Sequence, residues 1–234
     1  MRNVKALEML NEGRIDELKK ELQDEIYQET LKSKPDAKKR YTAMKKYFKY
    51  YKPVRESLQK PCKIEFDGKP YISFTNSWSL ALTTEDTGEI ELYDESHGKY
   101  PDVERLMSFK GNCVKIDISK VIAEAKSKGY KLIKGEVDYH YNYLMLYDDS
   151  YYKIGLLDAT FGIIEDGKPA AAYKVSGVNR PLTLETDIGF CLLMPIRYDG
   201  DPEADGKIVI RVWEWYLKGD DNGNYIWFFR SWIN

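Results

Sequence analysis

Residues 152–197, which read YKIGLLDATFGIIEDGKPAAAYKVSGVNRPLTLETDIGFCLLMPIR, decide the fold. Apolar residues recur at helical spacing at the start of this stretch. They predict a helix over 153–164 whose buried face carries Ile154, Leu157, Phe161 and Ile164. Three runs of β-forming residues follow, namely AAAYKVS, PLTLET and GFCLLMP, and turn-forming sequences separate them. A helix followed by three short strands predicts a sheet with a helix packed on one face.

The chain before this stretch contains further short runs that predict strands. Four of them follow residue 60, and they are CKIEF (62–66), PYISFTN (70–76), WSLALTT (78–84) and EIELYDE (89–95). The run CVKID (113–117) predicts another strand, and Asp117 predicts the N-cap of a helix that ends at Gly129. Strands are also expected near 131–138 and 142–148. The order of helices and strands predicts an α+β fold of antiparallel sheets with two helices on one face.

The first 60 residues predict helices. An amphipathic helix over about 14–31 follows a short first helix, and we interpret it as a packing element with the apolar face Ile15, Leu18, Leu22 and Ile26. Pro35 and Asp36 predict the start of a further helix, and Pro53 predicts its end. The buried stripe of this helix is expected to contain Ala37, Tyr41, Met44, Phe48 and Tyr51.

Positive charge is concentrated in that last helix. Residues 32–60 carry 11 basic and 2 acidic residues, whereas residues 61–234 carry a net charge of −8. A face of lysines gains affinity for phosphates by releasing counterions, although it reads no sequence. This face is therefore either a solvated surface or a phosphate-binding one.

The last segment, 201–234, predicts an aromatic β-hairpin. Residues 207–217 and 224–232 predict two strands around an Asp-Asn-Gly turn. The segment also contains Trp213, Trp215, Trp227 and Trp232. We favour packing over ligand binding for these rings, either against the core or against another chain.

The sequence contains no recognisable catalytic or metal-binding motif. Its three cysteines are far apart, and it has only two histidines, His97 and His140. The residues after Asp201 imitate the start of a calcium loop, but Val212 stands where the bidentate carboxylate belongs. We therefore expect no enzyme, no metal and no cofactor, and a carboxylate site around 199–205 is the weakest hypothesis. No apolar run has the length of a membrane helix, so we expect a cytoplasmic protein without a membrane partner.

Three stretches, over 152–197, 98–107 and 74–82, together resemble the bacterial sliding clamp, the β subunit of the replicative DNA polymerase. Clamps end in a strand like GFCLLMPIR (189–197), and they contain a helix like YKIGLLDATFGII (152–164). The stretch GKYPDVERLM (98–107) is similar to a linker between clamp domains. FTNSWSLAL (74–82) is similar to the clamp motif Ala-Thr-Asp-Gly-His-Arg-Leu-Ala, with departures at residues 76–79. The resemblance implies a clamp-like unit over 98–200, a basic helical segment with a partial unit over 1–97, and a hairpin extension over 201–234.

The resemblance implies a hydrophobic peptide pocket for short motifs of polymerases and repair proteins. By position, this pocket would contain Thr75, Leu80, Pro101, Leu106, Leu192, Met194, Pro195, Ile196 and Arg197. A proline and small apolar residues leave a groove, and methionine adapts to several ligands. The alternative is that LLMPI is simply the end of a buried strand.

The resemblance also implies a surface that contacts duplex DNA through phosphates. By position, its counterparts here are Lys120, Lys126 and Lys128. The basic helix has no clear counterpart in clamps. We infer that it substitutes for the missing basic surface through Lys38, Lys39, Arg40, Lys45, Lys46, Lys49 and Lys52.

The sequence thus favours a sliding-clamp-like, non-enzymatic DNA-associated protein that tethers a replication or repair partner. Its expected partners are duplex DNA, a peptide motif of a polymerase or repair protein, and further copies of itself. The small size favours a phage or mobile-element origin. The alternative is a clamp-fold interaction module that does not bind DNA and acts as a decoy or self-associates.

Overall fold

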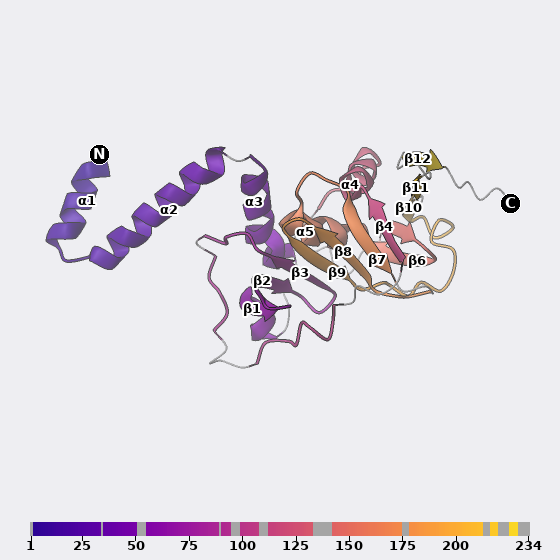
Figure 1. Cartoon of the computed structure of the whole chain (residues 1–234), viewed down its shortest axis with the longest axis horizontal. Coiled ribbons are helices and arrows are strands. Elements are labelled where there is room, and N and C mark those ends of the chain that lie inside the picture. Colours follow the sequence, from indigo (N-terminus) through magenta and orange to yellow (C-terminus); the bar gives the residue numbers. More distant parts are fainter. Residues whose placement is uncertain are drawn as a thin grey trace.

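The computed structural model describes residues 2–33, 35–50, 55–88, 90–94, 99–107, 112–132, 142–174, 178–212, 216–219 and 225–228. Three helices come first: α1 (Arg2–Asn11), α2 (Ile15–Ser33) and α3 (Pro35–Tyr50). A short 3₁₀ helix over Glu56–Leu58 leads into the first strands. Figure 1 shows α1 and α2 standing away from the sheets, whereas α3 packs against them.

The remaining elements alternate between strands and two helices. They are β1 (Cys62–Phe66), β2 (Lys69–Thr75), β3 (Ser79–Thr83), β4 (Asn112–Ile116), α4 (Ile118–Ser127), β5 (Tyr143–Tyr147), β6 (Ser150–Lys153), α5 (Ile154–Ile164), β7 (Ala170–Lys174), β8 (Leu182–Thr186), β9 (Gly189–Leu193), β10 (Ile208–Arg211), β11 (Tyr216–Gly219) and β12 (Tyr225–Phe228).

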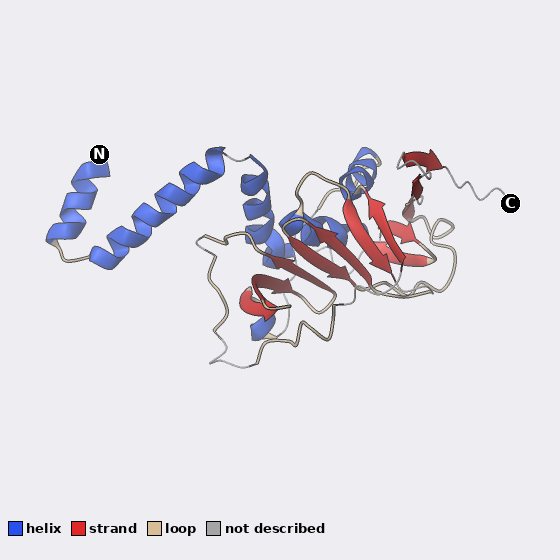
Figure 2. Ribbon diagram, viewed as in Figure 1, coloured by secondary structure: helices blue, strands red, loops and turns tan. Residues whose placement is uncertain are grey.

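The main sheet is antiparallel and has the strand order β1-β2-β3-β9-β8-β7-β4 (Figure 2). A second sheet has the order β10-β5-β6, and β11 pairs with β12. In the second sheet β10 runs parallel to β5, so the prediction of purely antiparallel sheets is wrong there.

The main sheet contains two copies of one arrangement, a helix followed by three antiparallel strands. The first copy is α3 with β1, β2 and β3, and the second is α5 with β7, β8 and β9. The copies join through the pairing of β3 with β9, where Ala81 lies opposite Cys191. The two helices also pack closely, because a Cβ atom on Gly162 would lie 3.2 Å from the Cβ of Ala43.

The core lies between the main sheet and the helices. Phe74, Ala81 and Cys191 from the sheet are fully buried against side chains of α3, α4, α5 and the second sheet. The predicted helix after Asp117 is confirmed, since the Asp117 carboxylate accepts a hydrogen bond from the Lys120 backbone N–H at 3.1 Å. The α+β fold class with helices on one face of the main sheet is therefore confirmed.

A hydroxyl network crosses this core between the two copies. Thr160 on α5 donates to the Ser79 hydroxyl at 2.8 Å, and the Tyr47 hydroxyl on α3 lies 3.0 Å from the same oxygen. Ser79 in turn donates to the Asn76 side-chain oxygen at 3.3 Å. Burial raises the pKa of Tyr47 well above its usual range, so this hydroxyl stays protonated. The network thus links α3, β3 and α5 without a charge.

Several predicted details of the fold are wrong. Residues 90–94 do not form the expected strand; instead Tyr93 donates a backbone hydrogen bond to Pro61 at 2.7 Å. The most buried residue of α3 is Tyr47, which lies outside the predicted stripe. On α2 only Leu18 of the expected apolar face is buried, whereas Ile15, Leu22 and Ile26 are exposed.

The C-terminal segment forms the predicted hairpin only in part. β11 and β12 pair antiparallel, but residues 208–211, assigned to the first hairpin strand, pair with β5 instead. The side chains of the four tryptophans and most of the strand predicted at 131–138 lie outside the described residues. Among the helices that the structure describes, none is long and apolar enough to cross a membrane.

Candidate functional site

The two motif segments FTNSWSLAL and GFCLLMPIR lie side by side in the main sheet. Thr75 on β2, Leu80 on β3 and Leu192 on β9 form one row across neighbouring strands. All three are buried, and the Thr75 hydroxyl donates to the Ser79 carbonyl at 2.9 Å. The structure therefore brings together three residues that the sequence assigned to one pocket.

The chain after β9 continues past the turn that precedes β3. The Met194 backbone N–H donates to the Trp78 carbonyl at 2.9 Å, and the Ile196 N–H donates to the Tyr151 carbonyl at 2.9 Å. Ile196 is buried with Leu144 against the second sheet. Met194 and Trp78 are 36% and 52% exposed, so an apolar surface remains open at this point. Pro195 is half-buried and Arg197 is exposed.

The turn that carries Trp78 is fixed by local hydrogen bonds. The Asn76 side-chain oxygen accepts from the backbone N–H groups of Trp78 at 3.0 Å and Ser79 at 2.8 Å. Ser77 has a φ of +75°, at the position where the similar clamp motif has glycine. The hydroxyl network of Ser79 ends at the same Asn76 oxygen. The position of Trp78 is thus set by the core beneath it.

A cation lies against this aromatic ring. The Lys153 ammonium, at the end of β6, is 5.7 Å from the centre of the Trp78 ring. We call the surface formed by the exposed side chains of Trp78 and Met194 the Trp78–Met194 surface. The sequence did not indicate Trp78 because the motif departs there, and it did not indicate Lys153 because the resemblance of the stretch 152–164 assigns that residue no role. The Asn-Ser turn before Trp78 was the available signal.

The segment 99–107 covers the row of Thr75, Leu80 and Leu192 on the face of the main sheet opposite the helices. Tyr100, Val103 and Met107 pack in one cluster with Leu80 and Leu192. The Tyr100 hydroxyl donates to the Ser73 carbonyl at 3.1 Å, which ties the linker to β2. The other two assigned linker residues differ in exposure, since Pro101 is half-buried and Leu106 is 46% exposed.

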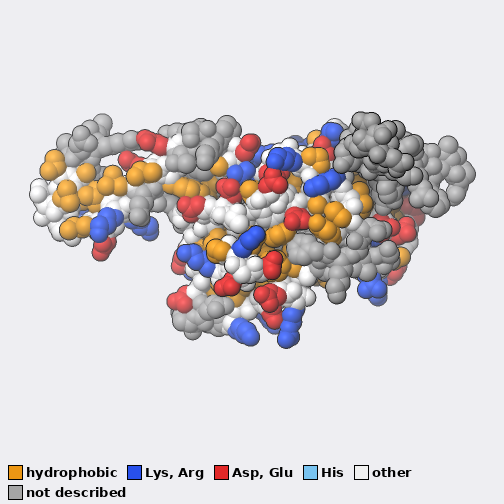
Figure 3. Space-filling view, in the orientation of Figure 1, with side chains coloured by type: hydrophobic (Ala, Val, Ile, Leu, Met, Phe, Trp, Pro, Cys, Tyr) orange, Lys and Arg blue, Asp and Glu red, His pale blue; other side chains and the backbone are white. Residues whose placement is uncertain are grey.

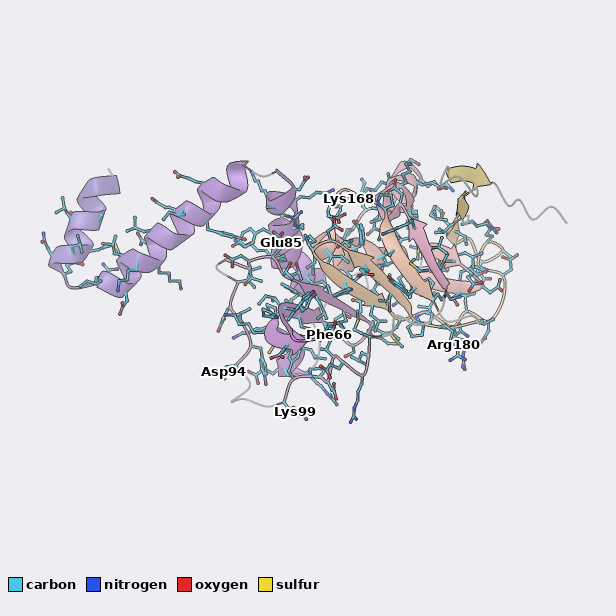
Figure 4. The ribbon with its side chains drawn as sticks, in the orientation of Figure 1. Phe66, Glu85, Asp94, Lys99, Lys168 and Arg180 are labelled. Carbon is cyan, nitrogen blue, oxygen red and sulfur yellow. The ribbon has the colours of Figure 1, made fainter. Side chains whose placement is uncertain are left out.

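Two of the cations assigned to DNA, Lys39 and Arg40, pair with carboxylates of the protein. The Arg40 guanidinium lies 3.2 Å from the Glu85 carboxylate, and it donates to the Glu165 carbonyl at 3.1 Å. Figure 4 shows Glu85 beside α3. Lys39 lies 2.7 Å from the Glu165 carboxylate, which also accepts from the Ser119 hydroxyl at 2.7 Å. These contacts tie α3 to α4 and α5.

The remaining assigned cations differ in their surroundings. Lys38, Lys45 and Lys46 are exposed on α3, and the Lys45 ammonium lies 5.0 Å from the centre of the Tyr41 ring. Lys120, Lys126 and Lys128 on or beside α4 pair with Asp117, Asp158 and Glu124 at 3.3, 3.5 and 2.9 Å. The Lys49 side chain and all of Lys52 lie outside the described residues.

Burial raises the pKa of Asp158, and the nearby Lys126 ammonium opposes that rise. Each of the three lysines on or beside α4 thus lies within 3.5 Å of a carboxylate. The positive charge of α4 is compensated by these carboxylates, and on α3 the side chains of Lys38, Lys45 and Lys46 are exposed.

The carboxylates after residue 198 do not converge on one point. Glu203 accepts two hydrogen bonds from Arg211 at 2.7 and 2.8 Å, and Asp205 accepts one from Tyr198 at 2.6 Å. Asp201 accepts a backbone hydrogen bond from Glu203 at 2.9 Å. Within the part of the chain that the structure describes, no three acidic, histidine or cysteine side chains form a group suited to a metal ion.

Comparison with known proteins finds similar folds among solved structures. No protein-family model and no curated protein matches the chain. The DNA polymerase III β subunit of Thermotoga maritima aligns with 72% of this chain at 9% identity and a TM-score of 0.45. The DNA polymerase sliding clamp of Bacillus subtilis aligns with 68% of it at 13% identity and a TM-score of 0.42. The alignments cover 65% and 62% of those two chains, so this chain spans less than two thirds of either. Both belong to the family that the sequence motifs resemble.

Arg40 and Lys38 offer a matched pair on one helix. We expect Arg40→Ala to lower the free energy of unfolding by about 2 kcal/mol, because it removes two contacts that are largely shielded from water. Lys38→Ala should change it by less than about 0.5 kcal/mol, because that side chain is exposed. Urea unfolding followed by tryptophan fluorescence measures both. Equal losses in the two variants would show that Arg40 is a surface cation.

Proposed function

We propose that this chain is a sliding-clamp-like scaffold without catalytic activity, which holds a hydrophobic peptide of a replication or repair partner at the Trp78–Met194 surface. One observation carries the proposal. Two segments that are far apart in the chain, each similar to a clamp motif, pair as neighbouring strands and leave Trp78 and Met194 exposed side by side. A buried strand end, the alternative at the sequence level, would leave no such apolar pair at the surface.

The chemistry of this surface suits a short apolar ligand. Exposed tryptophan side chains contribute strongly to binding because they bury a large area at a low entropic cost. Methionine adapts its shape to different apolar side chains. The Lys153 side chain, which is largely buried, supports the ring from below with its ammonium 5.7 Å from the ring centre. The hydrogen-bonded turn beneath Trp78 holds the ring in place before a ligand arrives.

DNA contact through α3 is the second part of the proposal. Lys38, Lys45 and Lys46 are exposed on α3, whereas Lys39 and Arg40 of the same helix pair with carboxylates of the protein. Contacts of this kind bind phosphates without regard to sequence and weaken as salt is added. The alternative, an interaction module that does not bind DNA, is favoured by the carboxylates beside Lys120, Lys126 and Lys128.

Peptide binding can be measured by fluorescence anisotropy with a labelled hydrophobic peptide that contains leucine and phenylalanine. We expect micromolar affinity for the full chain. Trp78→Ala and Met194→Ala should each weaken binding by about tenfold, which corresponds to about 1.4 kcal/mol. A peptide with both apolar residues changed to alanine should not bind.

Leu10→Ala is the matched control for this measurement, because it removes a similarly exposed apolar side chain from α1. Its affinity for the peptide should equal that of the unchanged protein. If Trp78→Ala binds the peptide as well as Leu10→Ala does, the Trp78–Met194 surface is not the peptide site.

DNA contact is tested with a labelled duplex at two salt concentrations. We expect binding that weakens steeply with salt, and the triple change Lys45→Glu, Lys46→Glu and Lys49→Glu should abolish it. The control carries Lys63→Glu, Lys69→Glu and Lys99→Glu, which are exposed lysines outside α3. Absence of binding at low salt, or equal loss in both triple variants, would leave the DNA-independent interaction module.

A further inference from the structure

Exposed apolar side chains are concentrated on the first two helices. Figure 3 shows hydrophobic side chains gathered along α1 and α2, at the end of the molecule far from the C-terminus. Leu7 and Leu10 on α1 are 58% and 51% exposed, and Ile15 and Leu22 on α2 are 49% and 47% exposed. Monomeric proteins rarely expose an apolar patch of more than a few hundred Å² unless it binds something. We call this pair of helices the α1–α2 arm.

The arm already has a small core of its own, and the exposed side chains lie outside it. Met9 of α1 and Leu18 of α2 are buried, at 1% and 9% exposure. The turn between the helices is closed by a backbone hydrogen bond from Arg14 to Met9 at 2.9 Å. Ile15 and Leu22 are seven residues apart and therefore share one face of α2. Folding of the arm by itself leaves that face in water.

The arm is attached to the body of the protein at one defined point. The Tyr27 hydroxyl donates to the Asp86 carbonyl at 2.8 Å, and its ring meets the Tyr41 ring edge to face at a centroid distance of 5.2 Å. Gly88 lies directly under the Tyr27 ring, since a Cβ atom there would be 2.5 Å from a ring carbon. This contact holds α2 by its C-terminal half, and the rest of the arm projects away from the sheets (Figure 1).

We propose that the α1–α2 arm pairs with the same arm of a second copy of this chain. Charge is the first reason. Residues 1–33 contain six basic and eight acidic residues, and both signs are interspersed in local pairs such as Arg14 with Glu12 and Lys19 with Asp16. A surface of mixed sign fits neither a polyanion nor an anionic lipid surface, both of which attract clustered cations. It fits an identical surface, because a two-fold interface presents the same patch on both sides.

Area and shape are the second reason. Four side chains, each about half exposed, give an apolar patch on the order of 300 Å² in each copy. Two such patches bury about 600 Å² of apolar surface, roughly half of the 1,200 Å² at the lower end of specific interfaces, and the polar residues around them would bury the rest. At about 1.5 Å per residue, the 19 residues of α2 are long enough for two arms to form a four-helix arrangement. Because the arm projects away from the sheets, the sheets of the two copies would not clash in such a dimer.

Light scattering during gel filtration of the full chain tests the proposal over a range of concentrations. We expect twice the monomer mass of 27.3 kDa for the unchanged protein. The double variant Ile15→Asp and Leu22→Asp should run at the monomer mass, with a dissociation constant at least 100-fold higher. Both residues are exposed, so circular dichroism and urea unfolding of the monomer should not change.

The double variant Trp78→Ala and Met194→Ala is the control, since it removes exposed apolar side chains elsewhere and should remain a dimer. A monomer mass for the unchanged protein at all concentrations overturns the proposal, and so does a dimer that survives both aspartates. Peptide binding is read separately by anisotropy, so failure of the dimer does not affect the proposed function.

Discussion

The antiparallel pairing of β3 with β9 is the contact on which the rest of the structure depends. It joins two arrangements of one helix and three strands into a single sheet, with Ala81 opposite Cys191 at the middle of the junction. The helices of the two halves meet on one face of that junction, and Tyr47, Ser79 and Thr160 share a buried hydroxyl network there. Each hydroxyl of this network has a hydrogen-bond partner, whereas the buried side-chain nitrogen of Asn76, at the end of the network, has none.

The pairing of β3 with β9 also determines where Trp78 and Met194 lie on the surface. Once β3 and β9 are in register, the chain leaving β9 must pass the turn before β3, and Met194 meets the Trp78 carbonyl there. The Ser79 network reaches that turn through Asn76, so the core and the Trp78–Met194 surface are one connected structure. The basic helix α3 packs in the same core, and its cations Lys39 and Arg40 pair there with Glu165 and Glu85. Both side chains therefore contribute to the packing of α3.

Local sequence patterns predicted α5, most strands and the Asp117 cap, because these depend on periodicity and on hydrogen bonds between near neighbours. These patterns did not predict the contacts between residues that are far apart in the sequence. Nothing near Arg40 in the sequence indicates Glu85, and nothing near residues 90–94 shows that Tyr93 bonds to Pro61 rather than to a strand. The candidate site divides in the same way: motif similarity pointed to Leu192 and Met194, whereas Trp78 and Lys153 became visible only when the fold brought their segments together.

A cross-strand disulfide tests the β3–β9 register most directly, because Cys191 is already in place. In Ala81→Cys the new thiol would lie directly opposite Cys191, at a separation that a disulfide spans in antiparallel sheets. In Leu82→Cys the new side chain would point to the other face of the sheet. Oxidative refolding followed by mass spectrometry should give an 81–191 crosslink in the first variant and no 82–191 crosslink in the second. Absence of the 81–191 crosslink, or equal crosslinking in both variants, would contradict the pairing from which the Trp78–Met194 surface is built.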